Sequence, residues 1–266
     1  MLKENEINLI IDTAVNAGRE ILTIYNSNEF ETEIKNDGSP LTKADNASHK
    51  IINDSLIKYF PDIPVVSEEG KDIDFELRKN FKSFWLVDPL DGTKEFIKKN
   101  GEFTVNIALI ENNIPVFGVI YAPAFEENGS KGKLWWGGKE YGAFYRLGNS
   151  EIDLTGEIKY QDKLTAVISR SHATEADQEI LSKYKIENFI SVGSSLKFCM
   201  IAEGKADLYH RSGPTNEWDV AAGCAIAEGA GCEVAGLKFN KESFLNSSFT
   251  VLGKRLLMKT KSFMEL

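Results

Sequence analysis

The chain contains little cysteine and no long hydrophobic run. Its three cysteines, Cys199, Cys224 and Cys232, form an odd set without C-x-x-C spacing, which favours reduced thiols in a cytosolic core over a disulfide or zinc framework. No apolar stretch approaches the ~18 residues that a membrane span requires, and no signal-peptide pattern is visible. We therefore expect a cytoplasmic protein without a transmembrane segment.

Positive charge is also scarce, because 31 Lys and Arg residues stand against 40 Asp and Glu residues, for a net charge of −9. A nucleic-acid-binding surface needs clustered Lys and Arg to replace counterions, so nucleic acid is not an expected partner. The acidic residues are instead candidates for gathering around metal ions. With 42% hydrophobic and 27% charged residues, the 266-residue chain has a globular composition and enough length for one large domain or two modest ones.

The pattern of the first half predicts two helices followed by a mostly antiparallel sheet. Apolar residues at helical spacing predict a long helix over the first two dozen residues, and Thr42 is placed to cap a second helix from about Lys43 to Tyr59, which Pro61 stops. Strands are expected at residues 65–66, 84–87, 134–136 and 142–145, with a hairpin formed by residues 104–110 and 115–121.

From about Glu151 the rhythm changes. Expected strands at residues 165–169, 189–192 and 206–209 alternate with expected helices at residues 174–184, 195–203 and 218–230. This alternation predicts an α/β unit stacked on the first half. No linker or repeat is visible, so we expect two packed, sheet-containing lobes, an N-terminal α+β lobe over residues 1–150 and a C-terminal α/β lobe over residues 151–266.

The most informative run is Trp85-Leu-Val-Asp-Pro-Leu-Asp-Gly-Thr93. Its apolar start predicts a buried strand that ends where Pro89 removes a backbone donor and fixes φ. Asp88 and Asp91 then flank a tight turn, across which the two carboxylates can converge, and converged anions repel unless a cation lies between them. The last two residues open a helix whose unpaired N–H groups suit a phosphate. The run predicts adjacent places for a divalent metal and a phosphate, and the alternative is an ordinary polar turn.

Three further acids lie at the ends of expected elements. Glu68 and Glu69 follow a strand, and Asp219 begins a helix. Residues at such ends can meet in one cleft although they are distant in sequence, and oxygen ligands without neighbouring His or Cys favour Mg²⁺ over Zn²⁺. Taken singly, Asp219 also fits a helix N-cap and the two glutamates a solvated charge pair. Their occurrence together with the run around Asp88 favours a metal site.

Three sequence runs resemble the signatures of the inositol monophosphatase superfamily, which comprises Mg²⁺-dependent, lithium-sensitive phosphatases. They are W-L-V-D-P-L-D-G-T, the S-E-E that precedes it, and W-D-V-A-A-G. Their order and spacing cover nearly the whole chain. The resemblance implies a layered αβαβα sandwich of α+β and α/β character, with the active site between its two lobes.

Other details resemble one branch, the 3′(2′),5′-bisphosphate nucleotidases of the CysQ type. Lys94-Glu95-Phe96 stands where inositol phosphatases typically carry Thr-Asn-Phe. The segments at residues 37–45, 169–172, 193–199 and 213–219 are similar to the same branch. His210 is a departure, because proline is expected there, and it bears only on the local loop shape.

The resemblance implies that two or three Mg²⁺ ions bind the carbonyl of Leu90 and four carboxylates, those of Glu68, Asp88, Asp91 and Asp219. It also implies catalytic roles for Glu68, Thr93 and Asp45, the last two deprotonating the attacking water, because a hydroxyl can accept the water proton only while passing its own to a carboxylate. Glu69 and Lys35 are implied to support these groups from behind. From the sequence alone, Asp45 also fits an exposed first-turn acid and Lys35 a solvated lysine.

On the substrate side, the resemblance implies contacts from His172, from Ser194 near a helix start, and from the charges of Lys197 and Arg211. The phosphate is expected to contact the metal-site residues as well: Glu68, Leu90, Asp91, Gly92, Thr93 and Asp219. The N-terminal lobe then carries most metal ligands, and the C-terminal lobe carries Asp219 and the nucleotide contacts. The alternatives place Lys197 on the wet face of a helix and His172 at a helix cap.

The implied reaction removes the 3′-phosphate of adenosine 3′,5′-bisphosphate, and of its 5′-phosphosulfate analogue, which places the enzyme in sulfur metabolism and nucleotide salvage. The alternatives are an inositol or sugar phosphatase on the same fold and a non-catalytic nucleotide or metal sensor. Monomer and homodimer both remain open. Relatives associate peripherally with the cytoplasmic face of the inner membrane, but the basic segment at residues 254–261 favours a last packed strand or helix over a membrane contact.

Overall fold

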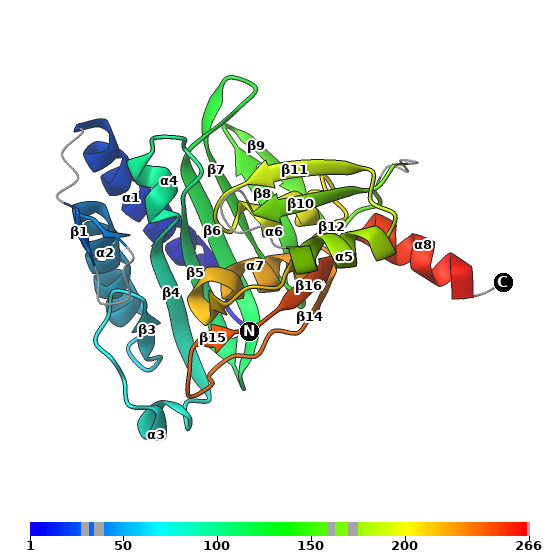
Figure 1. Ribbon diagram of the computed structural model, residues 1–266. Helices are drawn as coiled ribbons and strands as arrows, with labels where there is room; N and C mark the ends of the chain where they lie inside the picture. Colours follow the sequence, from blue (N-terminus) through cyan, green and yellow to red (C-terminus); the bar gives the residue numbers. More distant parts are fainter. Residues whose placement is uncertain (28–31, 35–39, 159–162, 170–174, 265–266) are drawn as a thin grey trace.

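The computed structural model describes residues 1–27, 32–34, 40–158, 163–169 and 175–264. Within them, the chain builds five layers in the order helix, sheet, helix, sheet, helix (Figure 1). The expected αβαβα sandwich is therefore confirmed.

The first helical layer consists of α1 (Glu4–Ser27) and α2 (Lys43–Tyr59), which pack side by side on the outer face of the larger sheet. Thr42 caps α2, as expected: its hydroxyl accepts from the backbone N–H of Ala44, while its own N–H donates to the side chain of Asp45. The apolar stripes of both helices bury against Trp85 and Val87 of the sheet.

The larger sheet has seven strands in the order β3-β4-β5-β6-β7-β8-β9, and every pair is antiparallel except β3 with β4. The bounds are β3 Val65–Ser67, β4 Ser83–Asp91, β5 Thr104–Glu111, β6 Ile114–Glu127, β7 Ser130–Gly138, β8 Gly142–Leu147 and β9 Ser150–Asp153. The short helices α3 (Phe75–Arg78) and α4 (Thr93–Ile97) lie before and after β4. Because both faces of this sheet are covered, its central strands have continuous apolar sequences.

The middle layer contains α6 (Leu196–Ala202) and α7 (Glu217–Gly229), which separate the two sheets. Small residues let α7 lie directly against β6. A Cβ added to Gly118 would stand 2.4 Å from the carbonyl oxygen of Ala222, and one added to Gly223 would stand 2.4 Å from the ring of Phe198. These close contacts fix the helix between its neighbours.

The second sheet has five strands in the order β11-β10-β12-β16-β14. Its bounds are β10 Thr165–Ser169, β11 Asn188–Val192, β12 Leu208–Arg211, β14 Glu233–Ala235 and β16 Phe249–Leu252. Two short strand pairs complete the fold, β1 (Glu33–Ile34) with β2 (Pro40–Leu41) and β13 (Thr215–Asn216) with β15 (Leu245–Asn246). The expected strand at residues 206–209 begins two residues later than predicted, because Ala206 and Asp207 still belong to the turn after α6.

The outer helical layer consists of α5 (Glu175–Lys183) and α8 (Lys254–Met264). In α8, buried Leu256 packs with Leu208 of the sheet, and Arg255 forms an ion pair with buried Asp207 at 2.6 Å. The C-terminal segment is therefore a packed helix, as the sequence favoured. In the described part of the chain, no helix is long and apolar enough to cross a membrane.

Candidate active site

A bulge at the end of β4 brings Asp88 and Asp91 to one face of the sheet. Asp88 pairs with Asn106 of β5, whereas Asp91 pairs with Thr104, so three steps along β4 match two steps along β5. Partners two residues apart on a strand face the same way, and the two aspartates therefore do so too. The sequence placed the end of the strand at Pro89, and this was wrong, because β4 runs to Asp91 and a bulge accommodates the proline.

Hydrogen bonds from α2 and to the carboxylate of Asp88 stabilise the bulge. Ser48 of α2 donates a hydrogen bond to the carbonyl of Pro89 at 2.7 Å. The N–H of Leu90 donates to Oδ1 of Asp88 at 3.0 Å, and the Leu90 carbonyl accepts from the hydroxyl of Thr93 at 3.3 Å. The Leu90 carbonyl, expected as a metal ligand, thus lies next to the hydroxyl that is expected to act on the substrate water.

Glu68 and Asp219 approach the same end of β4 from other elements. Glu68 directly follows β3, and its N–H donates to the carbonyl of Val87 at 3.1 Å. Asp219 occupies the third position of α7, where Asn216 is the cap, so it is not the N-cap itself. Its Oδ2 accepts from the N–H of Asn216 at 3.0 Å and from the hydroxyl of Thr215 at 2.9 Å. The geometry thus brings acids from β3, β4 and α7 together.

These acids share one electrostatic environment. Burial raises the pKa of Asp88 well above its usual range, and repulsion by the surrounding carboxylates raises it further; they are Glu68, Asp91, Asp219 and Asp45. Burial, Asp91 and Glu68 together raise the pKa of Asp219 to about 7. Burial also raises the pKa of Asp91, although nearby Lys197 and two hydrogen bonds oppose that shift. In the described part of the chain, no three acidic, histidine or cysteine side chains lie close enough together to hold a metal ion as they stand. The acids are close enough to repel one another, which is the condition that a bound cation relieves.

Asp45 and Thr93 meet between α2 and α4. The hydroxyl of Thr93 donates to Oδ1 of Asp45 at 3.2 Å, and Oδ2 of Asp45 accepts from the N–H of Thr42 at 2.8 Å. Asp45 is 1% exposed, so it is not the solvated first-turn acid that the sequence left open. Burial raises its pKa despite these hydrogen bonds, which makes the carboxylate a better proton acceptor.

Glu69 lies behind these groups. Burial raises the pKa of Asp45 and the charge of Glu69 adds to that shift, whereas burial lowers the pKa of His49 and Glu69 opposes the lowering. His49 shares a hydrogen bond of 2.9 Å with Ser67. This position is compatible with the supporting role expected for Glu69. Lys35 and His172 lie outside the described residues.

A cavity of about 200 Å³ opens beside the acids and is lined by residues from both halves of the chain. The residues that line it include Asp91, Gly92, Thr93, Ser194, Lys197, Arg211 and Asp219. Gly92 adopts φ +90° at the start of α4, where a Cβ would stand 3.0 Å from the carbonyl of Glu102. Seven of the expected substrate contacts therefore line one cavity.

Lys197 is buried rather than on a wet helix face, since it is 4% exposed. Its Nζ donates to the carbonyl of Ser194 at 2.5 Å, and burial lowers its pKa to about 8. Arg211 donates through Nη2 to the carbonyl of Pro214 at 2.7 Å, while its buried Nε has no partner among the described residues. Two positively charged groups thus line a cavity next to the acids, as a doubly phosphorylated ligand requires.

The sequence did not identify a hydroxyl and amide network behind this cavity. The Thr104 hydroxyl lies 2.7 Å from that of Ser194 and 2.8 Å from that of Ser195. Ser195 in turn donates through Oγ to Asn106 at 2.8 Å and through its N–H to Asp91 at 2.6 Å. The available signal was the presence of Thr104 and Asn106 in an otherwise apolar buried strand. The network joins the predicted metal ligand Asp91 to the loop that carries Ser194.

The residues present fit Mg²⁺. The acids and the Leu90 carbonyl offer oxygen ligands alone, and Asp88 is 1% exposed with several like charges around it. Hard oxygen donors are the ligands that Mg²⁺ prefers, and a buried acidic cluster is costly without a cation.

The fold and this acidic site define a class of phosphatases. The chain matches the inositol monophosphatase family over residues 3–265 and belongs to it. The expected superfamily is therefore confirmed.

Individual relatives point to one branch. The 3′(2′),5′-bisphosphate nucleotidase CysQ of Escherichia coli is 44% identical over 253 residues, which cover 91% of this chain and 97% of the relative. The protein of the same name from Haemophilus influenzae is 34% identical over 260 residues, which cover 95% and 94%. The crystal structure of CysQ from Bacteroides thetaiotaomicron superposes with a TM-score of 0.80 at 43% identity, over 93% of this chain and 96% of that one.

Proposed function

We propose that this chain is a Mg²⁺-dependent phosphomonoesterase that removes the 3′-phosphate of adenosine 3′,5′-bisphosphate, giving AMP and orthophosphate. The same activity would extend to the 5′-phosphosulfate analogue. The relatives of the CysQ type support the branch. The observation that carries the chemistry is the bulge in β4, because it turns Asp88 and Asp91 to one face beside the Thr93–Asp45 hydrogen bond.

Mg²⁺ would be held by Glu68, Asp88, Asp91, Asp219 and the Leu90 carbonyl. When bound, the ion lowers the pKa of water and offsets the negative charge that develops on the leaving oxygen. Thr93 and Asp45 carry the proton. The Thr93 hydroxyl accepts a proton from the attacking water only while its own passes to Asp45, and the hydrogen bond of 3.2 Å already points in that direction.

The second phosphate of the substrate requires its own counter-charge. Lys197 and Arg211 line the same cavity as Thr93, and we assign them to the 5′-phosphate. Ser194 is assigned to the same end of the substrate; its φ of +54° places it in the left-handed region, a strained conformation that adjoining structure must maintain. His172 is retained as a proposed nucleotide contact, and Lys35 as a proposed supporting charge.

We assign the enzyme to the cytoplasm, with a small-molecule nucleotide as its partner and two or three Mg²⁺ ions per active site. The division into lobes at residues 150 and 151 is kept as a proposal. α7 belongs to the second half of the chain but covers the inner face of the first sheet, so it would hold the lobes together.

A phosphate-release panel tests the function. Purified protein with Mg²⁺ is supplied with adenosine 3′,5′-bisphosphate, inositol 1-phosphate and fructose 1,6-bisphosphate, and kcat/KM is compared. We expect the nucleotide to exceed the other two by at least about 100-fold, which corresponds to roughly 3 kcal/mol of discrimination. A preference for inositol 1-phosphate would reassign the branch. Nucleotide binding without phosphate release would favour a sensor.

A further inference from the structure

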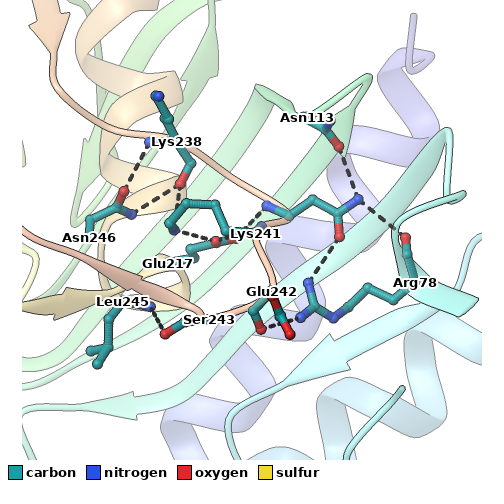
Figure 2. Close-up of polar contacts among 10 residues, drawn as sticks. Arg78, Asn113, Glu217, Lys238, Lys241, Glu242, Ser243, Leu245 and Asn246 are labelled. Atoms are coloured by element: carbon teal, nitrogen blue, oxygen red, sulfur yellow. Dashed lines mark hydrogen bonds and ion pairs between the residues drawn. The ribbon is translucent and has the colours of Figure 1, made fainter. Parts of the chain in front are cut away.

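A polar cluster with a buried centre lies beside the start of α7 (Figure 2). We call it the Glu217 cluster; its members are Arg78, Asn113, Glu217, Asn240 and Lys241. The described residues that line the active-site cavity include none of them. The expected chemistry therefore leaves the cluster without a role.

Glu217 is the centre of this cluster. It is the first residue of α7, and it is 0% exposed. Its carboxylate accepts from the backbone N–H of Asn240 at 2.6 Å, from the N–H of Lys241 at 3.1 Å and from Nζ of Lys241 at 2.6 Å. Its own N–H donates to the carbonyl of Phe244 at 2.9 Å. The first residue of the helix is thus bonded to the segment at residues 240–244 through both its side chain and its backbone.

That segment is in turn held in place. The amide of Asn246 accepts from the N–H of Lys238 at 3.0 Å and donates to the Lys238 carbonyl at 3.1 Å, which closes the loop between them (Figure 2). Asn240 adopts φ +60° within this loop. The partners of Glu217 are therefore presented by a loop of defined shape.

Asn240 extends the cluster to the larger sheet. Its Oδ1 accepts from Nη1 of Arg78 at 3.1 Å, and its Nδ2 donates to the Arg78 carbonyl at 3.2 Å and to Oδ1 of Asn113 at 3.0 Å. Arg78 is 2% exposed, and its guanidinium lies 4.0 Å from the centre of the Phe244 ring. The Phe244 ring lies 4.8 Å from that of Trp218, the residue between Glu217 and Asp219. Glu217 is thus bonded within the cluster, and Trp218 contacts the Phe244 ring that the Arg78 guanidinium also contacts.

The position of the cluster in the chain connects it to the predicted metal ligands. Arg78 ends α3, in the connection that runs from Glu68 to Asp88. Glu217 precedes Asp219 by two residues, with Trp218 between them, and Asp219 also belongs to the capping box of Asn216. Movement of the first turn of α7 would therefore move Asp219 relative to the acids of β3 and β4.

A purely structural contact does not require such groups. Burying a carboxylate and a guanidinium costs free energy that apolar residues of similar volume avoid. A bonded polar network does, however, select one geometry, and metal ligands must be held to within about 0.5 Å. Both carboxylate oxygens of Glu217 and both amide atoms of Asn240 are bonded, whereas Nε of Arg78 has no hydrogen-bond partner among the described residues. The Glu217 cluster therefore has the properties expected of a network that fixes the position of the first turn of α7.

We propose that Glu217 is a positioning residue for Asp219. It fixes the first turn of α7 against the loop at residues 238–246 and, through Asn240 and Arg78, against the connection between Glu68 and Asp88. The affinity for the divalent cation that Asp219 holds then depends on Glu217, which does not touch that cation. The inference rests on the proposed function, in which Asp219 is a metal ligand.

A Mn²⁺ titration without substrate tests the inference, with free Mn²⁺ followed by electron paramagnetic resonance. Asp219→Asn first identifies the binding step that depends on Asp219. Glu217→Ala is expected to weaken that same step about tenfold, or ~1.4 kcal/mol, and to leave the other steps within about twofold. Glu217→Gln keeps an acceptor oxygen for the loop and should stay within about threefold of the wild type. Glu228→Gln, in the last turn of the same helix, is the matched control and should bind as the wild type does.

Two results would overturn the inference: a folded Glu217→Ala protein that binds Mn²⁺ as tightly as the wild type at the Asp219 step, or one that weakens every step equally. If Glu217→Ala does not fold, Asn240→Ala replaces it. That variant removes the bonds to Arg78 and Asn113 and keeps the backbone bonds to Glu217, so the same step should weaken about threefold, and an unchanged affinity would contradict the inference. Failure of the wild-type protein to bind Mn²⁺ would instead contradict the proposed function.

Discussion

Asp88 combines two properties that conflict in a protein without a bound cation. It is 1% exposed, and several other carboxylates raise its pKa. The sequence could predict that Asp88 belongs to an acidic site, because the run around it has specific signatures. It could not predict the burial of Asp45, because a first-turn acid of a helix is usually solvated and only the packing of α2 on β4 removes it from water.

Asp88→Asn should separate activity from stability. With Mg²⁺, kcat should fall by about 10³-fold or more, since a metal interaction is worth several kcal/mol in the transition state. In EDTA at about pH 8, the free energy of unfolding should not fall and should rise by roughly 1 kcal/mol, because one member of a repelling cluster loses its charge. Phosphate release and urea denaturation check the two parts. Normal turnover by the variant would contradict the metal role.

Thr93 offers an equally specific test of the proton path. Thr93→Val keeps the shape of the side chain and removes the hydroxyl that donates to Asp45 at 3.2 Å. We expect kcat to fall by about 10²–10⁴-fold, the usual contribution of positioned proton transfer. Thr93→Ser, which retains the hydroxyl, should stay within about tenfold of the wild type. Equal kcat values for the two variants would exclude the hydroxyl from the reaction.

At the level of elements, the bulge in β4 shows what the sequence could and could not give. The apolar run and Pro89 predicted a strand followed by a turn, and the convergence of Asp88 and Asp91 was inferred from that turn. The aspartates do share a face, but they do so because β4 continues to Asp91 and gains one residue relative to β5. Register depends on the partner strand, so a local pattern cannot reveal a bulge.

Thr104 on β5 should matter for substrate binding because its hydroxyl joins Ser194 and Ser195. Thr104→Val should destabilise the fold by about 1–2 kcal/mol, the usual cost of leaving buried hydrogen-bonding groups without a partner. We expect KM for the nucleotide to rise by more than kcat falls, since the network supports the Ser194 loop rather than the proton path. Thr104→Ser is the control. A variant with normal KM and reduced kcat would contradict this assignment.

For the whole molecule, most element positions followed from hydrophobic period and turn residues, whereas the five-layer order followed from the family resemblance. The relation between the two halves did not. α7 was expected as an element of the second lobe, but it packs on β6 of the first sheet through Gly118 and Ala222. That contact depends on shape complementarity between residues far apart in sequence, which local patterns do not encode.

The stability of the whole protein should depend jointly on pH and Mg²⁺. In the folded protein the active-site aspartates have raised pKa values, so without metal it binds more protons than the unfolded chain between an ordinary aspartate pKa of 3.8 and the value of about 7 at Asp219. Stability therefore falls as pH rises through this window. Lys197, with a lowered pKa of about 8, acts in the opposite sense only above that value.

Thermal unfolding in EDTA and in millimolar Mg²⁺, at about pH 5.5 and pH 8, checks this dependence. In EDTA the Tm should be lower at the higher pH, and the rise in Tm on adding Mg²⁺ should be larger there. For a chain of this size, each kcal/mol corresponds to about 2–4 °C. The same gain in Tm at both pH values would show that cation binding is not coupled to these carboxylates.

The position of α7 between the sheets also bears on how ligands come and go. One face of this helix completes the interior of the first sheet and the other that of the second, so parting the two sheets would expose both apolar faces to water at once. We therefore expect the two sheets to stay packed together during turnover. We expect nucleotide and product to exchange through the mouth of the cavity, at a rate set by the side chains and loops at its rim rather than by a movement of one half of the molecule against the other.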